Sequence, residues 1–212
     1  MAVLILLTAL RGLTTAAPQS KATSCTEEQS SPTSTTSPNF YLVANVTSHD
    51  LQPSIQNWAV SSYHVGACLS VAVLEPNDAQ YHRAFYANGT SDQVRDGKRD
   101  ILTDGATPLT PYGFIVPPAN VTPSNDRIVS INCGDGTLGV AITRDPEPLH
   151  LTYTERDGGE FGSWYACNSS LPFGPAVALY YRDQDAETPQ DCAEVTLLPE
   201  WYVSLRIQMN RR

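Results

Sequence analysis

The sequence predicts an all-β domain, built as an antiparallel sandwich or barrel of about ten to twelve short strands. Short runs of β-branched and aromatic residues recur along the chain, and Asp-Gly or Asn-Gly pairs separate many of them. Sixteen prolines are spread over the 212 residues, and no window shows the one-sided apolar spacing of an amphipathic helix. A β-trefoil is the alternative, although the chain contains no clear internal repeat.

The strand candidates follow one another along most of the chain. Residues 40–47 are rich in strand formers, and residues 65–74 are almost continuously apolar, which is typical of one buried strand. We expect tight reversals at Asn88-Gly89, Asp104-Gly105 and Asp135-Gly136. Further predicted strands cover residues 81–86, 112–116, 127–132, 138–143, 149–154, 163–167, 176–181, 193–197 and 201–207.

The N-terminal part of the chain differs in composition from the rest. Residues 1–10 are almost wholly apolar but too few to span a bilayer, and small residues follow them, which predicts a signal peptide over residues 1–16. Residues 17–38 are rich in Ser, Thr and Pro and contain no large apolar side chain, so we expect a disordered, O-glycosylated spacer. A single β domain over residues 39–212 should follow.

Acceptor triplets for N-glycans agree with an exported chain. Asn-x-Ser/Thr occurs at Asn45, Asn88, Asn120 and Asn168, never with proline in the middle. We expect the first three to lie at strand ends or in turns, where a glycan has room. Asn168 follows Cys167 directly, so we expect early disulfide closure to block it. The leader and the triplets together indicate a secreted glycoprotein of the extracellular space or the cell wall.

The cysteines suit the same oxidising pathway. Of the five, Cys25 lies alone in the spacer, and the other four allow two bridges with three alternative pairings. Proximity along the chain favours Cys167–Cys192, which leaves Cys68–Cys133. The sequence alone does not choose among the three pairings, nor does it show whether Cys25 pairs between chains.

The acidic net charge of the chain argues against some classes of binding partner. The formal net charge is −9, so a nucleic acid or an anionic membrane surface would be repelled. Beyond the leader, no apolar run is long enough to span a membrane. The expected partners are therefore wall polysaccharide or another extracellular protein.

No catalytic or cofactor-binding constellation stands out. Residues 134–139 (Gly-Asp-Gly-Thr-Leu-Gly) match a dinucleotide fingerprint by letters, but a strand pattern follows them, so we interpret them as a hairpin on Asp135-Gly136. The acidic residues 183–187 lack the glycine and the closing glutamate of a calcium loop. The histidines have no metal-binding spacing, so neither metal nor cofactor is expected: His49, His64, His82 and His150. A hydrolase would need His64 or His82 beside a carboxylate in a cleft.

Aromatic residues provide the alternative to a purely structural protein. Trp58, Trp164 and Trp201 could form a platform on which a sugar stacks, if the fold brings them to one face. A carbohydrate-binding module or a secreted effector is therefore the second hypothesis. In most β domains, however, such rings fill the core.

The linear order of short motifs resembles a group of small secreted proteins of filamentous fungi whose function is unassigned. The matching segments include residues 40–44 (Phe-Tyr-Leu-Val-Ala), 66–69 (Gly-Ala-Cys-Leu), 84–86 (Ala-Phe-Tyr), 164–167 (Trp-Tyr-Ala-Cys) and 191–195 (Asp-Cys-Ala-Glu-Val). The layout is similar to that of the fungal cell-wall protein needed for phialide development. The resemblance covers residues 39–200 approximately and implies a wall-associated or extracellular, non-enzymatic β protein with a Cys167–Cys192 bridge. It implies no catalytic residue.

Overall fold

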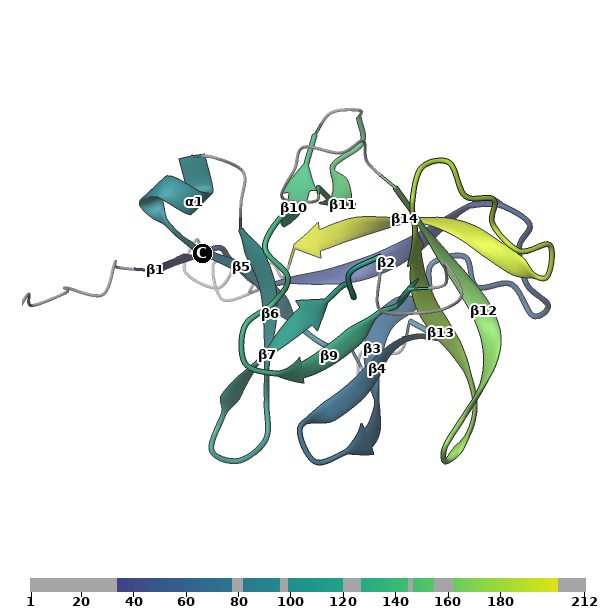
Figure 1. The fold of residues 1–212 in the computed structure, drawn as a ribbon, viewed down its shortest axis with the longest axis horizontal. Coiled ribbons are helices and arrows are strands. Elements are labelled where there is room, and N and C mark those ends of the chain that lie inside the picture. Colours follow the sequence, from purple (N-terminus) through teal and green to yellow (C-terminus); the bar gives the residue numbers. More distant parts are fainter. Residues whose placement is uncertain are drawn as a thin grey trace, which may run out of the picture. The chain divides into compact units, whose positions relative to one another are not determined.

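The computed structural model describes residues 34–77, 82–95, 99–119, 127–144, 147–154 and 162–201. These residues form strands and connecting turns, with one helix among them, the five-residue α1 (Ser91–Arg95) (Figure 1). The predicted all-β class is therefore confirmed. No helix within these ranges has both the length and the apolar character needed to cross a membrane.

The described residues form fourteen strands, and twelve of them join in one antiparallel sheet, in the order β1-β5-β6-β7-β9-β4-β3-β2-β14-β12-β13-β8. The remaining two, β10 and β11, pair only with each other. The bounds are β1 (Ser34–Thr36), β2 (Phe40–Ser48), β3 (Ala59–Gly66), β4 (Leu69–Glu75), β5 (Phe85–Thr90), β6 (Asp100–Gly105), β7 (Thr110–Ile115), β8 (Arg127–Ile128), β9 (Ser130–Cys133), β10 (Val140–Thr143), β11 (His150–Tyr153), β12 (Ser163–Leu171), β13 (Gly174–Arg182) and β14 (Cys192–Trp201).

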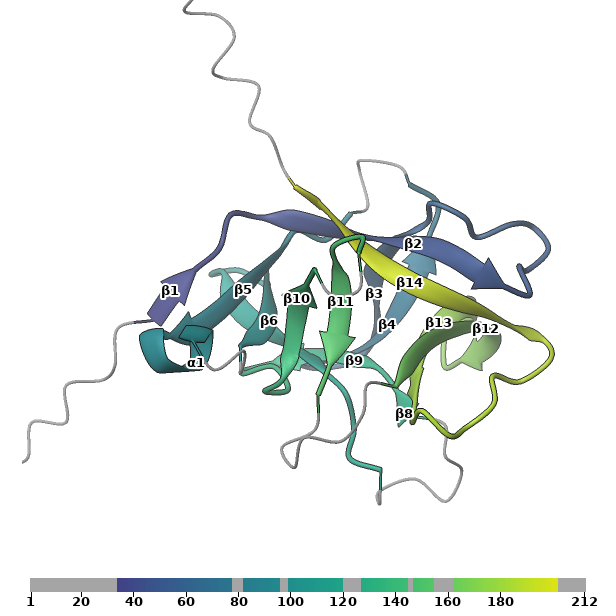
Figure 2. The same cartoon turned by 90° about the horizontal axis from the view of Figure 1, so that it is seen from above.

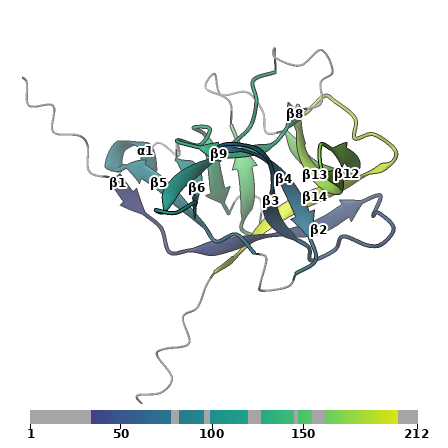
Figure 3. The ribbon, with the colours of Figure 1, turned by 90° about the horizontal axis from the view of Figure 1, so that it is seen from below.

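The large sheet bends back on itself. Phe40 of β2 pairs with Phe85 of β5, and Val177 and Ala178 of β13 pair with β4, so strands far apart in the sheet order meet again. Seen from below, β3 and β4 lie between β9 and β2 (Figure 3). The result is a strongly curved antiparallel sheet and not a clean barrel.

Apolar side chains from the curved sheet and from the β10–β11 pair form one core. The pair lies beside β14, between the β5–β6 side and the β12–β13 side (Figure 2). Phe114 makes edge contacts with Phe85 and Trp164, and Trp164 with Tyr181, at centroid separations of 6.3, 5.7 and 4.9 Å. Each such ring contributes about 1.5–3 kcal/mol by leaving water. These four aromatic side chains hold the two ends of the sheet together.

Two disulfides cross-link the sheet. Cys167–Cys192 joins register partners on β12 and β14, and Cys68–Cys133 joins the turn between β3 and β4 to the end of β9. The backbone amide of Cys133 also donates to the carbonyl of Cys68 at 3.1 Å. These are the two pairs that chain proximity favours. Cys25 lies outside the described residues.

The structure corrects several predicted boundaries. Residues 65–74 are not one strand, because the chain reverses at Ala67-Cys68, where Cys68 has a positive φ of 60°. Asn88-Gly89 is not a turn but part of β5, paired with Asp100 on one side and Thr36 on the other. At Asn88-Gly89, long-range pairing outweighs the local turn preference. At Ala67-Cys68, the chain turns inside an apolar run whose composition favours a continuous strand.

The interpretation of residues 134–139 as a hairpin is also wrong. β9 pairs with β4 and β7, whereas β10 pairs with β11, so the segment is a loop between two strands that do not meet. It packs closely on β7: a Cβ on Gly113 would lie 2.2 Å from the carbonyl oxygen of Asp135. Glycine is needed for this close approach.

The sheet also begins earlier than predicted. β1 pairs with β5 through Ser34↔Thr90, so its residues belong to the sheet and not to the expected spacer. Residues 1–33, which include the predicted signal peptide, lie outside the described residues. The same holds for residues 202–212, which include all of the last predicted strand except Trp201. All described residues fall in one compact unit.

Candidate functional site

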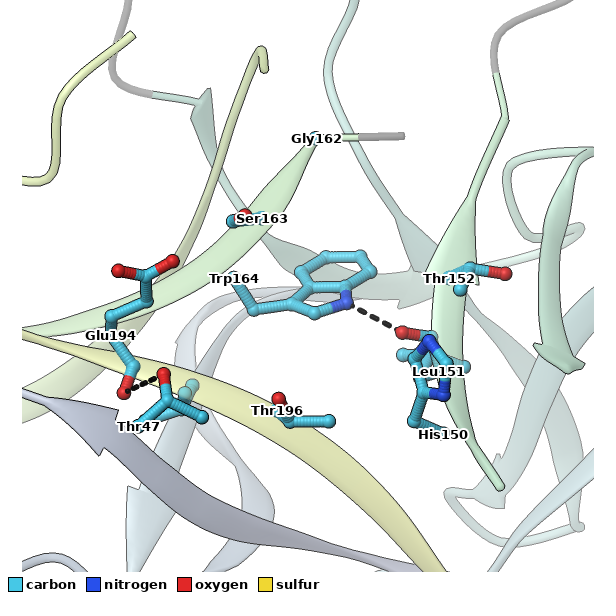
Figure 4. A pocket seen from close by; sticks show the side chains of 10 residues that line it. Thr47, His150, Leu151, Thr152, Gly162, Ser163, Trp164, Glu194 and Thr196 are labelled. Atoms are coloured by element: carbon cyan, nitrogen blue, oxygen red, sulfur yellow. Dashed lines mark hydrogen bonds between the residues drawn. The ribbon is translucent and has the colours of Figure 1, made fainter. Parts of the chain in front are cut away.

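One hollow lies where β11 approaches β12 and β14 (Figure 4). Its volume is about 170 Å³, and several of its polar groups are hydrogen-bonded within the protein. The indole Nε1 of Trp164 donates to the carbonyl of Leu151 at 2.8 Å, and Thr47 Oγ1 donates to the carbonyl of Glu194 at 3.2 Å. The Glu194 carboxylate accepts from Arg182 at 3.0 Å. The hollow is therefore a small gap between packed strands in which several polar groups already have partners within the protein.

A larger hollow of about 470 Å³ lies over β3, β5 and β6, and we refer to it as the Arg83 pocket. The β5–β6 pairing and the Phe40↔Phe85 contact hold these strands and the start of β2 together. Phe85 is fully buried, and its chain neighbours Ala84 and Tyr86 line the pocket. The lining residues are Asn39, Ser61, Ser62, His82, Arg83, Ala84, Tyr86, Thr103, Asp104 and Gly105.

Arg83 is the only cationic side chain among the lining residues other than a histidine. Its Nε donates to Ser62 Oγ at 2.5 Å, its Nη1 donates to the Asp104 carbonyl at 3.4 Å, and its guanidinium lies 5.8 Å from the centre of the Tyr112 ring. Burial lowers the pKa of Arg83 from its ordinary value, but a guanidinium stays protonated in proteins. Among the described residues it has no carboxylate partner, and its Nη2 makes no hydrogen bond.

A tyrosine and a carboxylate form a second polar pair in the pocket lining. The Tyr86 hydroxyl donates to Asp104 Oδ1 at 2.9 Å. Burial, followed by the hydrogen bond to Asp104, raises the pKa of Tyr86 to about 12, so this phenol stays neutral and keeps donating. Asp104 is exposed, and its Oδ2 is open to a further donor. As far as the described part of the chain goes, the pocket thus contains a cation with unpaired donors and an anion with an unpaired acceptor.

Two neighbouring residues shape the pocket. A Cβ on Gly105 would lie 3.3 Å from Arg83 Nη1 and 3.1 Å from the Tyr112 ring, so the missing side chain leaves room for the guanidinium. The His82 ring packs edge-on against Tyr41 at 5.1 Å, and its buried Nε2 has no hydrogen-bond partner among the described residues. Sequence reasoning treated Asp104-Gly105 only as a turn and did not find this site.

The predicted tryptophan platform does not form. Trp164 is only 4% exposed and belongs to the core, so it is unavailable for stacking on a sugar. Trp58 is partly buried against the same core, whereas Trp201 is 43% exposed and packs its edge on Phe40. The three rings fill or border the core instead of gathering on one face.

The four histidines are not brought together. His49 and His64 are exposed, His82 lines the Arg83 pocket, and His150 lies at the start of β11. Among the described residues, none of the four forms a salt bridge with a carboxylate. The same part of the chain contains no group of three His, Cys, Asp or Glu residues able to hold a metal ion.

Two of the glycan acceptors lie within strands and not at the strand ends or turns that the sequence suggested. Asn45 is inside β2 and accepts from Gln56 at 3.3 Å, and the Asn88 side chain hydrogen-bonds to the buried Asp100 within β5–β6. Asn168 is exposed on β12. Asn120 lies outside the described residues. The exposed site is therefore the one that was expected to be blocked.

Comparison with known proteins places this disulfide-linked β domain in a family. The chain belongs to the family described as Domain of unknown function (DUF7907), whose model matches residues 37–201. It is 35% identical over 185 residues to "Antigenic protein SchS34" of Stachybotrys chartarum, a match that covers 80% of this chain and 77% of that protein. No solved structure matches the chain. Both findings agree with the predicted resemblance to fungal proteins of unassigned function.

Proposed function

We propose that this protein is a secreted, non-enzymatic glycoprotein of the extracellular space or the cell wall. The observation that carries the proposal is the pair of disulfides within one β domain, Cys68–Cys133 and Cys167–Cys192. Such bridges persist in oxidising compartments and are rare in the cytosol. The apolar leader and the exposed acceptor Asn168 support the same route.

Association with the cell wall is the finer part of the proposal. It rests on the resemblance of the motif order to the fungal cell-wall protein needed for phialide development, which implies a late cysteine after a short strand, then a core strand, an acidic or Gly-rich loop and a second cysteine. In this chain that arrangement comprises β12, β13 and β14, with Cys167 and Cys192 as its cross-link. Non-covalent attachment would suit a domain with polar hollows on its surface.

Fractionation tests the proposed location. Antibodies raised against residues 37–201 should detect the protein in the culture medium or in the wall fraction, released from the wall by denaturant. Retention in the cytosol would overturn the proposal. Turnover of a polysaccharide or ester by the purified protein, abolished by His64→Ala or His82→Ala, would overturn its non-enzymatic part.

A second candidate function is carbohydrate binding, and the Arg83 pocket is the observation that favours it. Ser61, Ser62 and Thr103 line the pocket with hydroxyl groups, and Tyr86 and Asp104 provide an aromatic and a carboxylate side chain. Sugar recognition commonly uses a few placed polar groups in a concave site. Saturation-transfer NMR with a panel of monosaccharides tests this candidate, and a variant with Tyr86→Ala and Asp104→Ala should lose the signal.

A further inference from the structure

The Arg83 pocket contains donors without an acceptor among the residues that the structure describes. Arg83 donates from Nε to Ser62 and with one Nη1 hydrogen to the Asp104 carbonyl, so within the described ranges the Nη2 amino group and the second Nη1 hydrogen have no acceptor. These two nitrogens form one edge of a planar fork. That edge matches the spacing of the two oxygens of a carboxylate, so both can be bound at once.

The surroundings favour an anion with a single charge. Arg83 is the one guanidinium that lines the pocket, while the Asp104 carboxylate also borders it and the whole chain carries a net charge of −9. A phosphate dianion would gain one favourable charge and face several unfavourable ones. A carboxylate needs no more than the one planar fork.

The carboxylate of Asp104 favours a ligand that carries hydroxyl groups. Asp104 Oδ1 is already engaged by the Tyr86 hydroxyl, so Oδ2 is the acceptor available to a ligand. Because an ionised carboxylate only accepts hydrogen bonds, it repels a second carboxylate and binds a donor such as a hydroxyl. The neutral Tyr86 phenol keeps this carboxylate oriented.

From these contacts we propose that the Arg83 pocket binds a hydroxylated monocarboxylate of the sugar-acid class, with its carboxylate on the Nη edge of Arg83 and a hydroxyl on Asp104. The inference rests on the second candidate function and names its ligand class. It does not depend on whether the protein is attached to the wall. A sugar acid on a wall polysaccharide and a free sugar acid share this chemistry.

The test compares an acidic sugar with its neutral counterpart. Isothermal titration of the full secreted chain should give affinities for glucuronate and galacturonate roughly tenfold or more above those for glucose and galactose, since a charge-assisted bidentate pair is gained. Short uronate oligomers distinguish a polymer from a free acid: tighter binding of the oligomer assigns the pocket to polysaccharide. Inorganic phosphate should bind much more weakly than either acid.

Variants locate the effect at Arg83. Arg83→Gln should bring the affinity for the acid down to that for the neutral sugar, and Arg83→Lys should retain part of it because the ammonium keeps the charge but loses the fork. Gly105→Ala should lower acid binding several-fold without removing any charge, because its Cβ presses on Nη1. The control is Arg144→Gln, since Arg144 is an exposed arginine paired with Glu147 and does not line this pocket; it should change nothing.

The outcomes distinguish carbohydrate binding in general from the proposed preference for sugar acids. Equal binding of acidic and neutral sugars by the unmodified protein would overturn the sugar-acid inference and leave carbohydrate binding standing. Binding of neither would overturn both. Phosphate binding as tight as uronate binding, or uronate binding that survives Arg83→Gln, would overturn the proposed carboxylate contact.

Discussion

Cys167 and Cys192 are direct register partners on the antiparallel strands β12 and β14, with their Cα atoms 4.5 Å apart. This separation is typical of a non-hydrogen-bonded pair, in which opposite side chains are closest. The bridge therefore reinforces an existing strand pair at the point where β14 begins. It also closes the loop between β13 and β14, which contains the acidic residues Asp183, Asp185 and Glu187.

Removing this bridge should destabilise the domain strongly. Its closed loop spans 25 residues, for which the chain-entropy model gives about 3.5 kcal/mol. The double variant Cys167→Ala with Cys192→Ala should therefore melt roughly 10 °C lower in calorimetry and be secreted at a reduced level. Cys25→Ser is the control and should leave the melting temperature within about a degree or two. A comparable drop in melting temperature in Cys25→Ser and in the double variant would contradict a specific stabilising role for the Cys167–Cys192 bridge.

Glycan occupancy should differ between acceptors. Asn168 is exposed, so it should carry a glycan, whereas Asn88 hydrogen-bonds to Asp100, and Thr90 of the same triplet forms a reciprocal capping pair with Gln93 at the start of α1. Mass spectrometry after glycosidase treatment in heavy water reports each site. A glycan at Asn88 together with an unmodified Asn168 would contradict the described strand pairing of β5 and β6.

The stability of the domain should fall steeply in alkali because of Tyr181. Burial raises the pKa of Tyr181 to about 12, against 10 as the ordinary value. The native state therefore holds this proton longer than the unfolded chain does, so the stabilisation is complete below pH 10 and is lost as the pH rises through about 12. The loss is on the order of 2 kcal/mol.

Chemical denaturation of the unmodified protein and of Tyr181→Phe across this range measures the effect. The variant should be less stable at neutral pH, because the hydroxyl accepts from Gly162 at 2.6 Å and donates to the Tyr153 carbonyl at 3.3 Å. Between pH 10 and 12, however, its stability should decline less. Parallel curves for the two proteins would show that Tyr181 is not the responsible group.

A buried cation should make Asp183 important for stability. Arg127 is 0% exposed, lies 2.5 Å from Asp183 Oδ1 and faces the rings of Tyr181 and Tyr153 at 5.0 and 5.6 Å. Asp183→Asn should cost about 2 kcal/mol in urea denaturation, at the lower part of the range for charged hydrogen bonds because the aspartate is half exposed. Glu147→Gln breaks the exposed pair with Arg144 and should cost less than about 0.5 kcal/mol. Similar costs in the two variants would contradict a special role for the buried pair.

The parts of the fold that the sequence predicted well are those with strong local patterns. Residues 40–47 and 176–181 match β2 and β13 closely, because their β-branched and aromatic residues favour extended backbone by themselves. β3 and β6 were missed. The first contains two serines and a histidine, and the second begins with Asp100 and ends in Asp104-Gly105, so each forms a strand through its partners and not through its own composition.

The candidate site was beyond sequence reasoning for a similar reason. Ser62, Arg83 and Asp104 come from three separate parts of the chain and share no motif; the curvature of the sheet brings them together. The tryptophans predicted a platform for sugar stacking, but Trp164 packs in the core beside Phe114 and Tyr181. The Nη edge of the Arg83 guanidinium is identified as available to a ligand only once the hydrogen bonds of Arg83 within the described residues are known.

Intact-mass analysis and non-reducing peptide mapping of the protein recovered from culture medium test the central claim most directly. We predict a chain that has lost about its first 16 residues, carries a glycan at Asn168, and gives linked peptides for Cys167–Cys192 and Cys68–Cys133. Recovery of an unprocessed, unglycosylated chain with free thiols from the cytosol alone would contradict the proposal that this is an extracellular glycoprotein.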